Sequence, residues 1–195
     1  MNTIDFIRKK EWCIEQHRRV NQYYSEYLPY EFHLRMVYQA AKDFSHLVDN
    51  KDYLKDPKND GNENFISFKD ACEIACFGHD LLEDVHSISY NDVTKELGQA
   101  AADIIYAVTN EKGKNRKERA NLKYYEGIRN TPGAVFVKLC DRIANAQYGK
   151  LTKSSQFEMY KKENQGFIIS LGKLKGEAHE YDEMFNYLND LFESK

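Results

Sequence analysis

The chain has 195 residues, of which 42% are hydrophobic and 30% are charged, and this is enough for one domain with a full hydrophobic core. Its formal net charge of -3 at pH 7 gives no broad basic field, so a nucleic-acid partner is not expected. No secretion signal and no apolar run long enough to cross a bilayer are evident, which predicts a cytoplasmic protein without a membrane partner.

The four cysteines are Cys13, Cys72, Cys76 and Cys140. Cys72 and Cys76 are one helical turn apart in an apolar pattern, and the chain contains no C-x-x-C pair. This spacing favours buried, reduced thiols over disulfides or a zinc knuckle. Reduced thiols agree with a cytoplasmic location.

Hydrophobic residues recur at helical intervals from the start of the chain. Asn2 or Thr3 can cap a first amphipathic helix that extends towards Tyr24. Pro29 then disfavours helix in the residue before it and suits the start of a new helix, which we expect over 30–48.

The polar segment 49–64 contains a proline and a glycine and predicts an exposed loop, most simply an insertion. Ser67 begins a capping-box pattern for a helix that runs into the pair His79-Asp80. The basic run 110–119 is by itself typical of a solvated loop and helix start. Further helices are expected from Ser89 to Leu97, over 100–108, from Thr131 to Gly149, over 154–171 and over 177–192.

No alternating strand pattern exceeds the helical one, and no internal repeat is evident. The predicted fold is therefore all-α, a single-domain helical bundle over 1–195. The sequence leaves the oligomeric state open, a homodimer being one option.

The most unusual chemistry lies in the stretch 76–84, where the pair His79-Asp80 is followed by Glu83-Asp84. If the stretch is one continuous helix, one imidazole and three carboxylates share a face. Burying so many anionic groups is costly unless a cation or a proton compensates them. A bound metal ion between central helices is the expected compensator.

The candidate metal ligands lie on three predicted helices and are His33, His79 with Asp80, and Asp141. Two imidazoles and two carboxylates suit manganese, iron or zinc and leave positions for water and substrate. Such an ion lowers the pKa of bound water and orients a phosphate oxygen. Glu83 and Asp84 remain free to accept a proton from that water or to hold it in line.

The order His33, His79-Asp80, Asp141 resembles the H…HD…D signature of the HD superfamily of metal-dependent phosphohydrolases. The flanking residues resemble its (p)ppGpp-hydrolysing, SpoT-type branch. Four motifs carry this resemblance between about Pro29 and Gln147: Pro29-Tyr30-x-x-His33, His79-Asp80-x-x-Glu83-Asp84, Ala107-Val108-Thr109 before the basic run, and Val137-Lys138-Leu139-x-Asp141-Arg142-x-x-Asn145.

The resemblance implies an HD-type domain with a core of about 29–170 and one divalent ion, Mn²⁺ before Fe²⁺ or Zn²⁺. It implies that Glu83 and Asp84 position or activate the attacking water. The substrate-binding residues it implies are Asn145, Lys112, Lys114, Arg116, Lys138, Arg142 and Tyr160. The expected activity is that of a guanosine 3′,5′-bis(diphosphate) 3′-pyrophosphohydrolase, whose substrate is a small nucleotide.

The chain departs from that branch before the Pro29-Tyr30 element, where a Gly-Gln pair and basic residues are usual. It also has Leu34 where proline usually follows the histidine. Because the base pocket of the branch is built partly there, the base remains open. The alternatives are an HD nucleotidase or dNTP phosphohydrolase, and a non-catalytic nucleotide sensor. The absence of a G-x-x-x-x-G-K-[ST] loop argues against an NTPase of that class.

Overall fold

The computed structural model describes residues 1–49, 51–56, 65–110 and 113–194, without the side chains of 116 and 117. The elements in chain order are α1 (Thr3–Arg19), α2 (Glu31–Asp43), the 3-10 turn η1 (Ser45–Leu47), β1 (Leu54–Lys55), β2 (Phe65–Ile66), α3 (Phe68–Gly78), α4 (Leu81–Asp84), α5 (Tyr90–Leu97), α6 (Gln99–Val108), α7 (Arg116–Arg119), α8 (Leu122–Asn130), α9 (Ala134–Thr152), α10 (Ser155–Ser170) and α11 (Asp182–Glu193).

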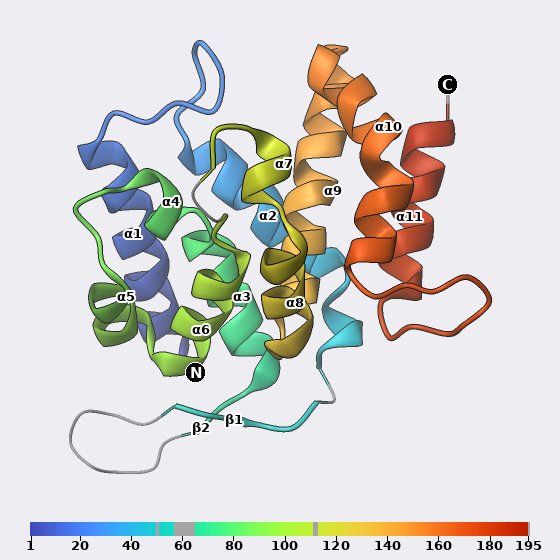
Figure 1. Ribbon diagram of the computed structural model, residues 1–195. Helices are drawn as coiled ribbons and strands as arrows, with labels where there is room; N and C mark the ends of the chain where they lie inside the picture. Colours follow the sequence, from blue (N-terminus) through green and yellow to red (C-terminus); the bar gives the residue numbers. More distant parts are fainter. Residues whose placement is uncertain (50, 57–64, 111–112, 195) are drawn as a thin grey trace.

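Helix α9 lies at the centre of the bundle. It contacts α2, α3, α6 and α8 on one side and the pair α10 and α11 on the other (Figure 1). Helix α1 covers α3 at one edge, and the short β1–β2 hairpin projects below the helices. The all-α prediction is confirmed, because packing of apolar helix faces accounts for nearly all of the described core.

A glycine allows α9 to lie close to its neighbours. Gly133 precedes α9 with a φ of +89°, a left-handed conformation that glycine adopts without steric cost. A Cβ there would lie 2.9 Å from both Cys72 Sγ and Ile104 Cδ1. The same position therefore starts the central helix and sets its approach to α3 and α6.

Side-chain caps begin several helices where the sequence predicts them. The side chains of Asn2 and Ser67 each accept a hydrogen bond from the backbone N–H three residues later. Ser89 forms a reciprocal capping box with Asp92. Gly98, with a φ of +98°, ends α5 as expected.

Several predicted boundaries were wrong. Helix α1 ends at Arg19 rather than near Tyr24, because Asn21 has a φ of +50° and turns the chain back on itself. Helix α2 ends at Asp43, where η1 replaces the last predicted turn. The stretch 76–84 is not one continuous helix, because α3 ends at Gly78 and α4 begins at Leu81. His79 and Asp80 lie in the break between them.

Other corrections concern segments between helices. Helix α8 was missed, and α9 begins at Ala134 rather than directly after the Thr131 cap. The predicted loop 49–64 contains β1, which pairs with β2 in a register of Leu54 with Ile66. Residues 57–64 of that loop lie outside the described part of the chain.

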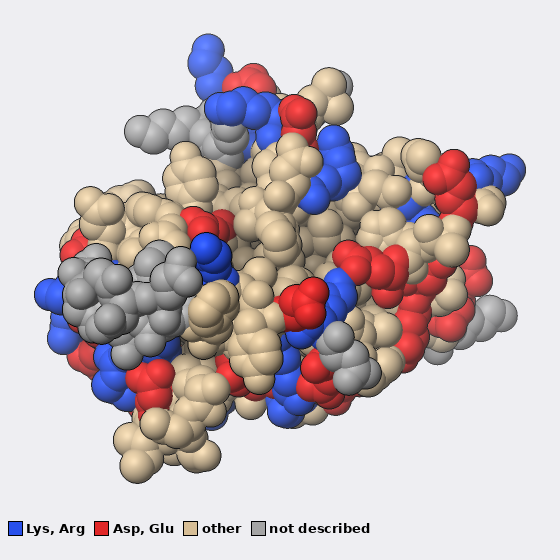
Figure 2. Space-filling view, turned by 90° about the horizontal axis from the view of Figure 1, so that it is seen from below, with Lys and Arg blue, Asp and Glu red and all other residues tan. Residues whose placement is uncertain are grey.

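The four cysteines are buried and free, as the sequence predicts. On the face shown in Figure 2, basic and acidic side chains are intermixed. Within the described residues, none of the helices combines the length and the apolar character needed to cross a membrane.

Candidate active site

The break between α3 and α4 presents His79 and Asp80 to the interior. Helix α3 ends at Gly78, where a Cβ would lie 2.5 Å from Ile105 Cδ1, so the end of α3 packs tightly on α6. His79 Nδ1 lies 3.0 Å from the carbonyl oxygen of Cys76. Because a carbonyl only accepts, Nδ1 carries a proton, and a neutral ring then offers the lone pair of Nε2.

His33, from α2, faces His79 across the site. Their Nε2 atoms are 3.2 Å apart, and both side chains are only 2% exposed. The ring of Tyr24 stacks on that of His33 at 4.7 Å and 13°. One donor atom each from His33, His79 and Asp80 lies within 4.8 Å of the others, a cluster of a size that can hold a metal ion.

Asp141, from α9, completes this cluster from a third direction. Its Oδ1 lies 3.5 Å from His33 Nε2 and 3.7 Å from His79 Nε2. Lys138 Nζ contacts the other carboxylate oxygen at 3.1 Å. Asn145, one turn further along α9, donates to Asp141 Oδ1 and accepts from the Tyr24 hydroxyl at 2.9 Å.

The electrostatics of the cluster are dominated by its carboxylates. Burial alone would lower the pKa of His79, but Asp80 and Asp141 overcome this effect and raise that pKa to about 9. Burial opposes ionisation of both carboxyls, yet His79 holds the pKa of Asp80, and Lys138 that of Asp141, below the usual range. Two aspartates and two buried imidazoles form a mixed oxygen and nitrogen donor set that fits a divalent cation.

Tyr30 fixes the orientation of Asp80. Its hydroxyl donates to Asp80 Oδ2, and burial followed by the charge of Asp80 raises the pKa of Tyr30 far above its ordinary value. The phenol therefore stays protonated and acts as a donor. Asp80 Oδ2 also lies 2.9 Å from His79 Nε2.

Glu83 and Asp84 lie on α4 beside the cluster but have different partners. Asn110 Nδ2 donates to Glu83 at 2.8 Å, and Arg119 lies 3.7 Å from its other oxygen. Gln22 Nε2 donates to Asp84 at 2.6 Å. Burial and then the charge of Asp80 raise the pKa of Asp84 above its ordinary value, which makes it a better proton acceptor than an ordinary aspartate.

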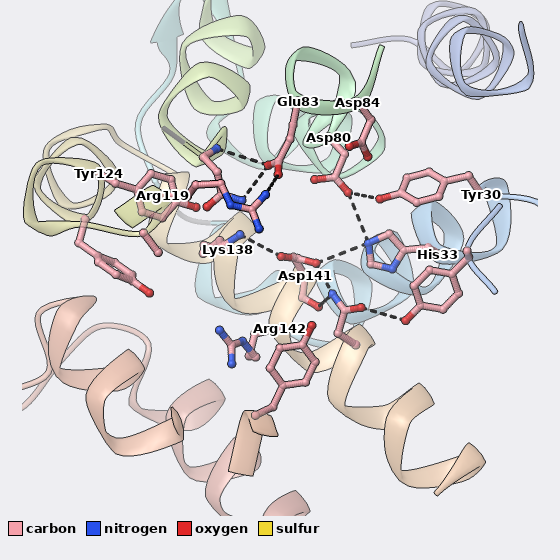
Figure 3. Close-up of a pocket in the computed structure, with 16 residues that line it drawn as sticks. Tyr30, His33, Asp80, Glu83, Asp84, Arg119, Tyr124, Lys138, Asp141 and Arg142 are labelled. Atoms are coloured by element: carbon pink, nitrogen blue, oxygen red, sulfur yellow. Dashed lines mark hydrogen bonds and ion pairs between the residues drawn. The ribbon is translucent and has the colours of Figure 1, made fainter. Parts of the chain in front are cut away.

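These groups surround a cavity of about 230 Å³. In Figure 3, Arg119 and Lys138 lie on one side of Asp141, and Tyr30 and His33 lie on the other. The cavity is lined by Tyr24, Tyr30, His33, Asp80, Glu83, Asp84, Asn110, Arg119, Ala120, Tyr124, Tyr125, Lys138, Asp141, Arg142, Asn145 and Tyr160. The His–Asp cluster and three cationic side chains, Arg119, Lys138 and Arg142, thus border one cavity, and we call these three the cationic wall.

Arg142 forms part of the cationic wall and is 5% exposed. Its guanidinium lies 4.4 Å from the ring centroid of Tyr160 and 4.0 Å from that of Phe167. Glu163 on α10 is 3.7 Å from its Nη1. Two aromatic faces and one carboxylate therefore hold this cation in place.

The structure brings most of the predicted site residues to this cavity. His33, Asp80, Asp141 and the predicted water-activating carboxylates line it, as do Asn145, Lys138, Arg142 and Tyr160, and His79 lies buried beneath. Lys114 is exposed and is not among the lining residues. Lys112 and the side chain of Arg116 lie outside the described residues.

The sequence did not indicate Tyr24, Asn110 or Tyr124 as lining residues, and it indicated Arg119 only as part of the basic residues 112–119 that the resemblance places at the phosphates. Arg119 belongs to the basic run 110–119, so charge density was a usable signal for it. Asn110 and Tyr124 have no such signal, because polar and aromatic residues of these types are common on helix faces and loops.

The chain thus folds as an all-α bundle with a His–Asp cluster between its helices. A solved structure described as that of a metazoan ortholog of SpoT, which hydrolyzes ppGpp and plays a role in starvation responses, has the same fold. Its TM-score is 0.65 at 16% sequence identity, covering 96% of this chain and 95% of that one. The sequence matches no protein-family model and no curated protein.

Proposed function

We propose that this chain is a metal-dependent phosphohydrolase of the HD type that hydrolyses a nucleotide, with guanosine 3′,5′-bis(diphosphate) as the substrate that fits best. The domain would span 1–195 with its core at about 29–170. One observation supports this proposal above the others. Two imidazoles and two carboxylates from three distant segments converge beside a cavity that Arg119, Lys138 and Arg142 also line.

The ligands of the metal would be His33, His79, Asp80 and Asp141, with Mn²⁺ preferred and Fe²⁺ or Zn²⁺ as alternatives. When bound, such an ion supplies a Lewis acid that lowers the pKa of a water nucleophile and neutralises phosphate charge. Tyr30 and Asn145 would orient the two carboxylates, since each donates to one of them.

The two carboxylates of α4 would handle the proton of the attacking water and the position of that water. Asp84 has a raised pKa and lines the cavity, so it would accept the proton of the attacking water. Glu83, held between Asn110 and Arg119, would keep that water in line. The water oxygen would form the new bond to phosphorus while the bond from that phosphorus to the ribose 3′ oxygen breaks. The ribose oxygen, as the leaving group, would take up the proton that Asp84 accepted, so that GDP and pyrophosphate are released.

The substrate phosphates would meet the cationic wall. Lys138 stays charged, because Tyr124 and Asp141 raise its pKa against the opposing effect of burial. Arg119 can exchange its contact with Glu83 for a phosphate, since guanidinium binds both anions by paired hydrogen bonds. Tyr160 and Asn145 would contact the nucleoside or its water shell, and Arg142 would lie behind them.

The direct test is purified protein with Mn²⁺ and ppGpp, with GDP and pyrophosphate followed by ion-exchange chromatography. Metal-dependent formation of both products in equal amounts is expected. Hydrolysis of deoxynucleotides without turnover of ppGpp would identify a nucleotidase or dNTP phosphohydrolase instead. Tight nucleotide binding in calorimetry, without product under any metal, would identify a sensor.

A further inference from the structure

Gln22 lies in the tight turn that follows α1, and both of its backbone groups are fixed. Its N–H donates to the carbonyl of His17 at 3.1 Å, and its carbonyl accepts from the N–H of Tyr30 at 3.2 Å. The left-handed Asn21 directs the chain into this turn. The side chain of Gln22 is therefore held between the end of α1 and the Asp84 carboxylate of α4.

The Gln22 amide joins two partners in one hydrogen-bond chain. Its Nε2 lies 2.6 Å from Asp84 Oδ2, and its Oε1 lies 2.7 Å from His17 Nδ1. An ionised carboxylate can only accept, so the amide must present its NH₂ group to Asp84. Its oxygen then faces His17 and requires a proton on Nδ1. The charge of one carboxylate thus fixes the direction of both hydrogen bonds.

The environment of His17 agrees with that direction. The residue is 1% exposed and its ring packs on Tyr30 with centroids 4.7 Å apart. Its Nε2 is buried and has no hydrogen-bond partner within the described chain. Burial lowers the pKa of His17, so the ring is neutral with Nε2 bare. A neutral ring leaves no buried donor unsatisfied.

We propose that Gln22 is a positioning residue for Asp84, with His17 as its anchor. This inference rests on the proposed function, in which Asp84 accepts the proton of the attacking water. Gln22 is not among the residues that line the cavity, so it acts through Asp84. Its hydrogen bond occupies Oδ2 and leaves Oδ1 for the water. A carboxylate free to rotate would lose this alignment.

The test compares Gln22→Met, which keeps the length of the side chain and removes both hydrogen bonds, with the control Gln39→Met. Gln39 makes the same kind of contact, to Asp43 at 2.7 Å, but on an exposed helix surface. With Mn²⁺ and ppGpp, Gln22→Met should lower kcat by roughly 10- to 100-fold. KM and Mn²⁺ affinity should change less than about threefold, and the control should match the wild type.

A double-mutant cycle separates positioning from general damage. In an Asp84→Asn background, Gln22→Met should lower kcat no further, because its effect passes through Asp84. Equal loss in both backgrounds, or an unchanged kcat in the single variant, would overturn the inference. Should Gln22→Met fold poorly, Gln22→Glu replaces it, since it keeps the shape and places an acceptor against Asp84; the same kcat loss is expected.

A second readout does not need turnover. Correlation of ¹⁵N and ¹H shifts should show the Nδ1–H tautomer of His17 in the wild type and its loss in Gln22→Met. An Nε2–H tautomer in the wild type contradicts the hydrogen-bond chain. If the wild type shows the Nδ1–H tautomer but has no activity, the proposed function is refuted. The catalytic role of the hydrogen bonds that join Asp84, Gln22 and His17 is then refuted with it.

Discussion

At the scale of single residues, the centre of the site is governed by which groups hold protons. His79 is buried between two carboxylates and its pKa is raised to about 9. A proton on this ring and a divalent ion therefore satisfy the same electrostatic demand of Asp80 and Asp141. Only one of them can occupy Nε2 at a time.

Metal binding is expected to strengthen with pH up to about 9, by at most about tenfold per unit, because His79 must lose its proton. Titration of the chelator-treated protein with Mn²⁺ between pH 6.5 and 8.5 measures this slope. A matched variant, His46→Gln, removes an exposed histidine paired with Glu183 and should leave the slope unchanged. A flat profile in the wild type would contradict the assignment of His79.

The same shift predicts the stability of the metal-free protein. The folded-state pKa of His79 lies above its unfolded value of 6.5, so its contribution is complete below pH 6.5 and is lost as pH rises towards 9. Thermal unfolding with chelator should show a Tm that falls over this interval, and Mn²⁺ should reduce the fall. A His79→Gln variant should lack this component of the pH dependence.

Arg119 has an exposed side chain, but it lines the cavity and lies 3.7 Å from Glu83 Oε1. Arg119→Gln should raise KM for ppGpp by roughly 10-fold, because it removes a charged hydrogen-bond donor from the cavity wall. Arg35→Gln is the control, since Arg35 pairs with Glu31 on an exposed surface. Steady-state kinetics measures both, and an unchanged KM in Arg119→Gln would place the phosphates elsewhere.

At the scale of elements, the site depends on how helices begin, end and approach one another. The break between α3 and α4 turns His79 towards His33 and Asp141. Glu83 and Asp84 line the cavity one turn further on. Two glycines make the surrounding packing possible: Gly78 at the end of α3 and Gly133 before α9. Because these two glycines have no Cβ, α3 and α9 can approach their neighbours closely enough to bring His79 and Asp141 together.

Gly133→Ala should destabilise the fold by about 2 kcal/mol or more, because it combines a left-handed φ with a Cβ 2.9 Å from two buried atoms. Gly127→Ala on α8 is the matched control. A Cβ there meets nothing within 4 Å, and alanine in a helix gains about 0.5–1 kcal/mol over glycine. Urea unfolding measures both, and equal stabilities would refute the packing argument.

At the scale of the whole molecule, α9 links the functional parts. It supplies Asp141, Lys138, Arg142 and Asn145, and it packs between helices α2 and α3 on one side and the α10–α11 pair on the other. Helix α10 supplies Tyr160 and Glu163, which both contact the guanidinium of Arg142. Loss of the α10–α11 pair would therefore expose one face of α9 and remove Tyr160 from the cavity lining.

The sequence by itself determined the helical class of the fold and the residues of the His–Asp cluster. Apolar periodicity is a local property, and caps such as Asn2, Ser67 and Ser89 act within one turn, so both are readable along the chain. His33 and His79 are two of six histidines in the chain. Their order with Asp80 matches a recognisable signature, and the three residues do converge.

Only the tertiary structure decided how that cluster is supported and what faces it. Gln22 and Asp84 are 62 residues apart, and Tyr24 and Asn145 are 121 apart, so no local pattern joins them. The break after Gly78 depends on how α3 packs on α6, and the burial of Arg142 depends on α10. Local propensity specifies which segments are helical, whereas directional hydrogen bonds and close packing between distant segments specify where each side chain points.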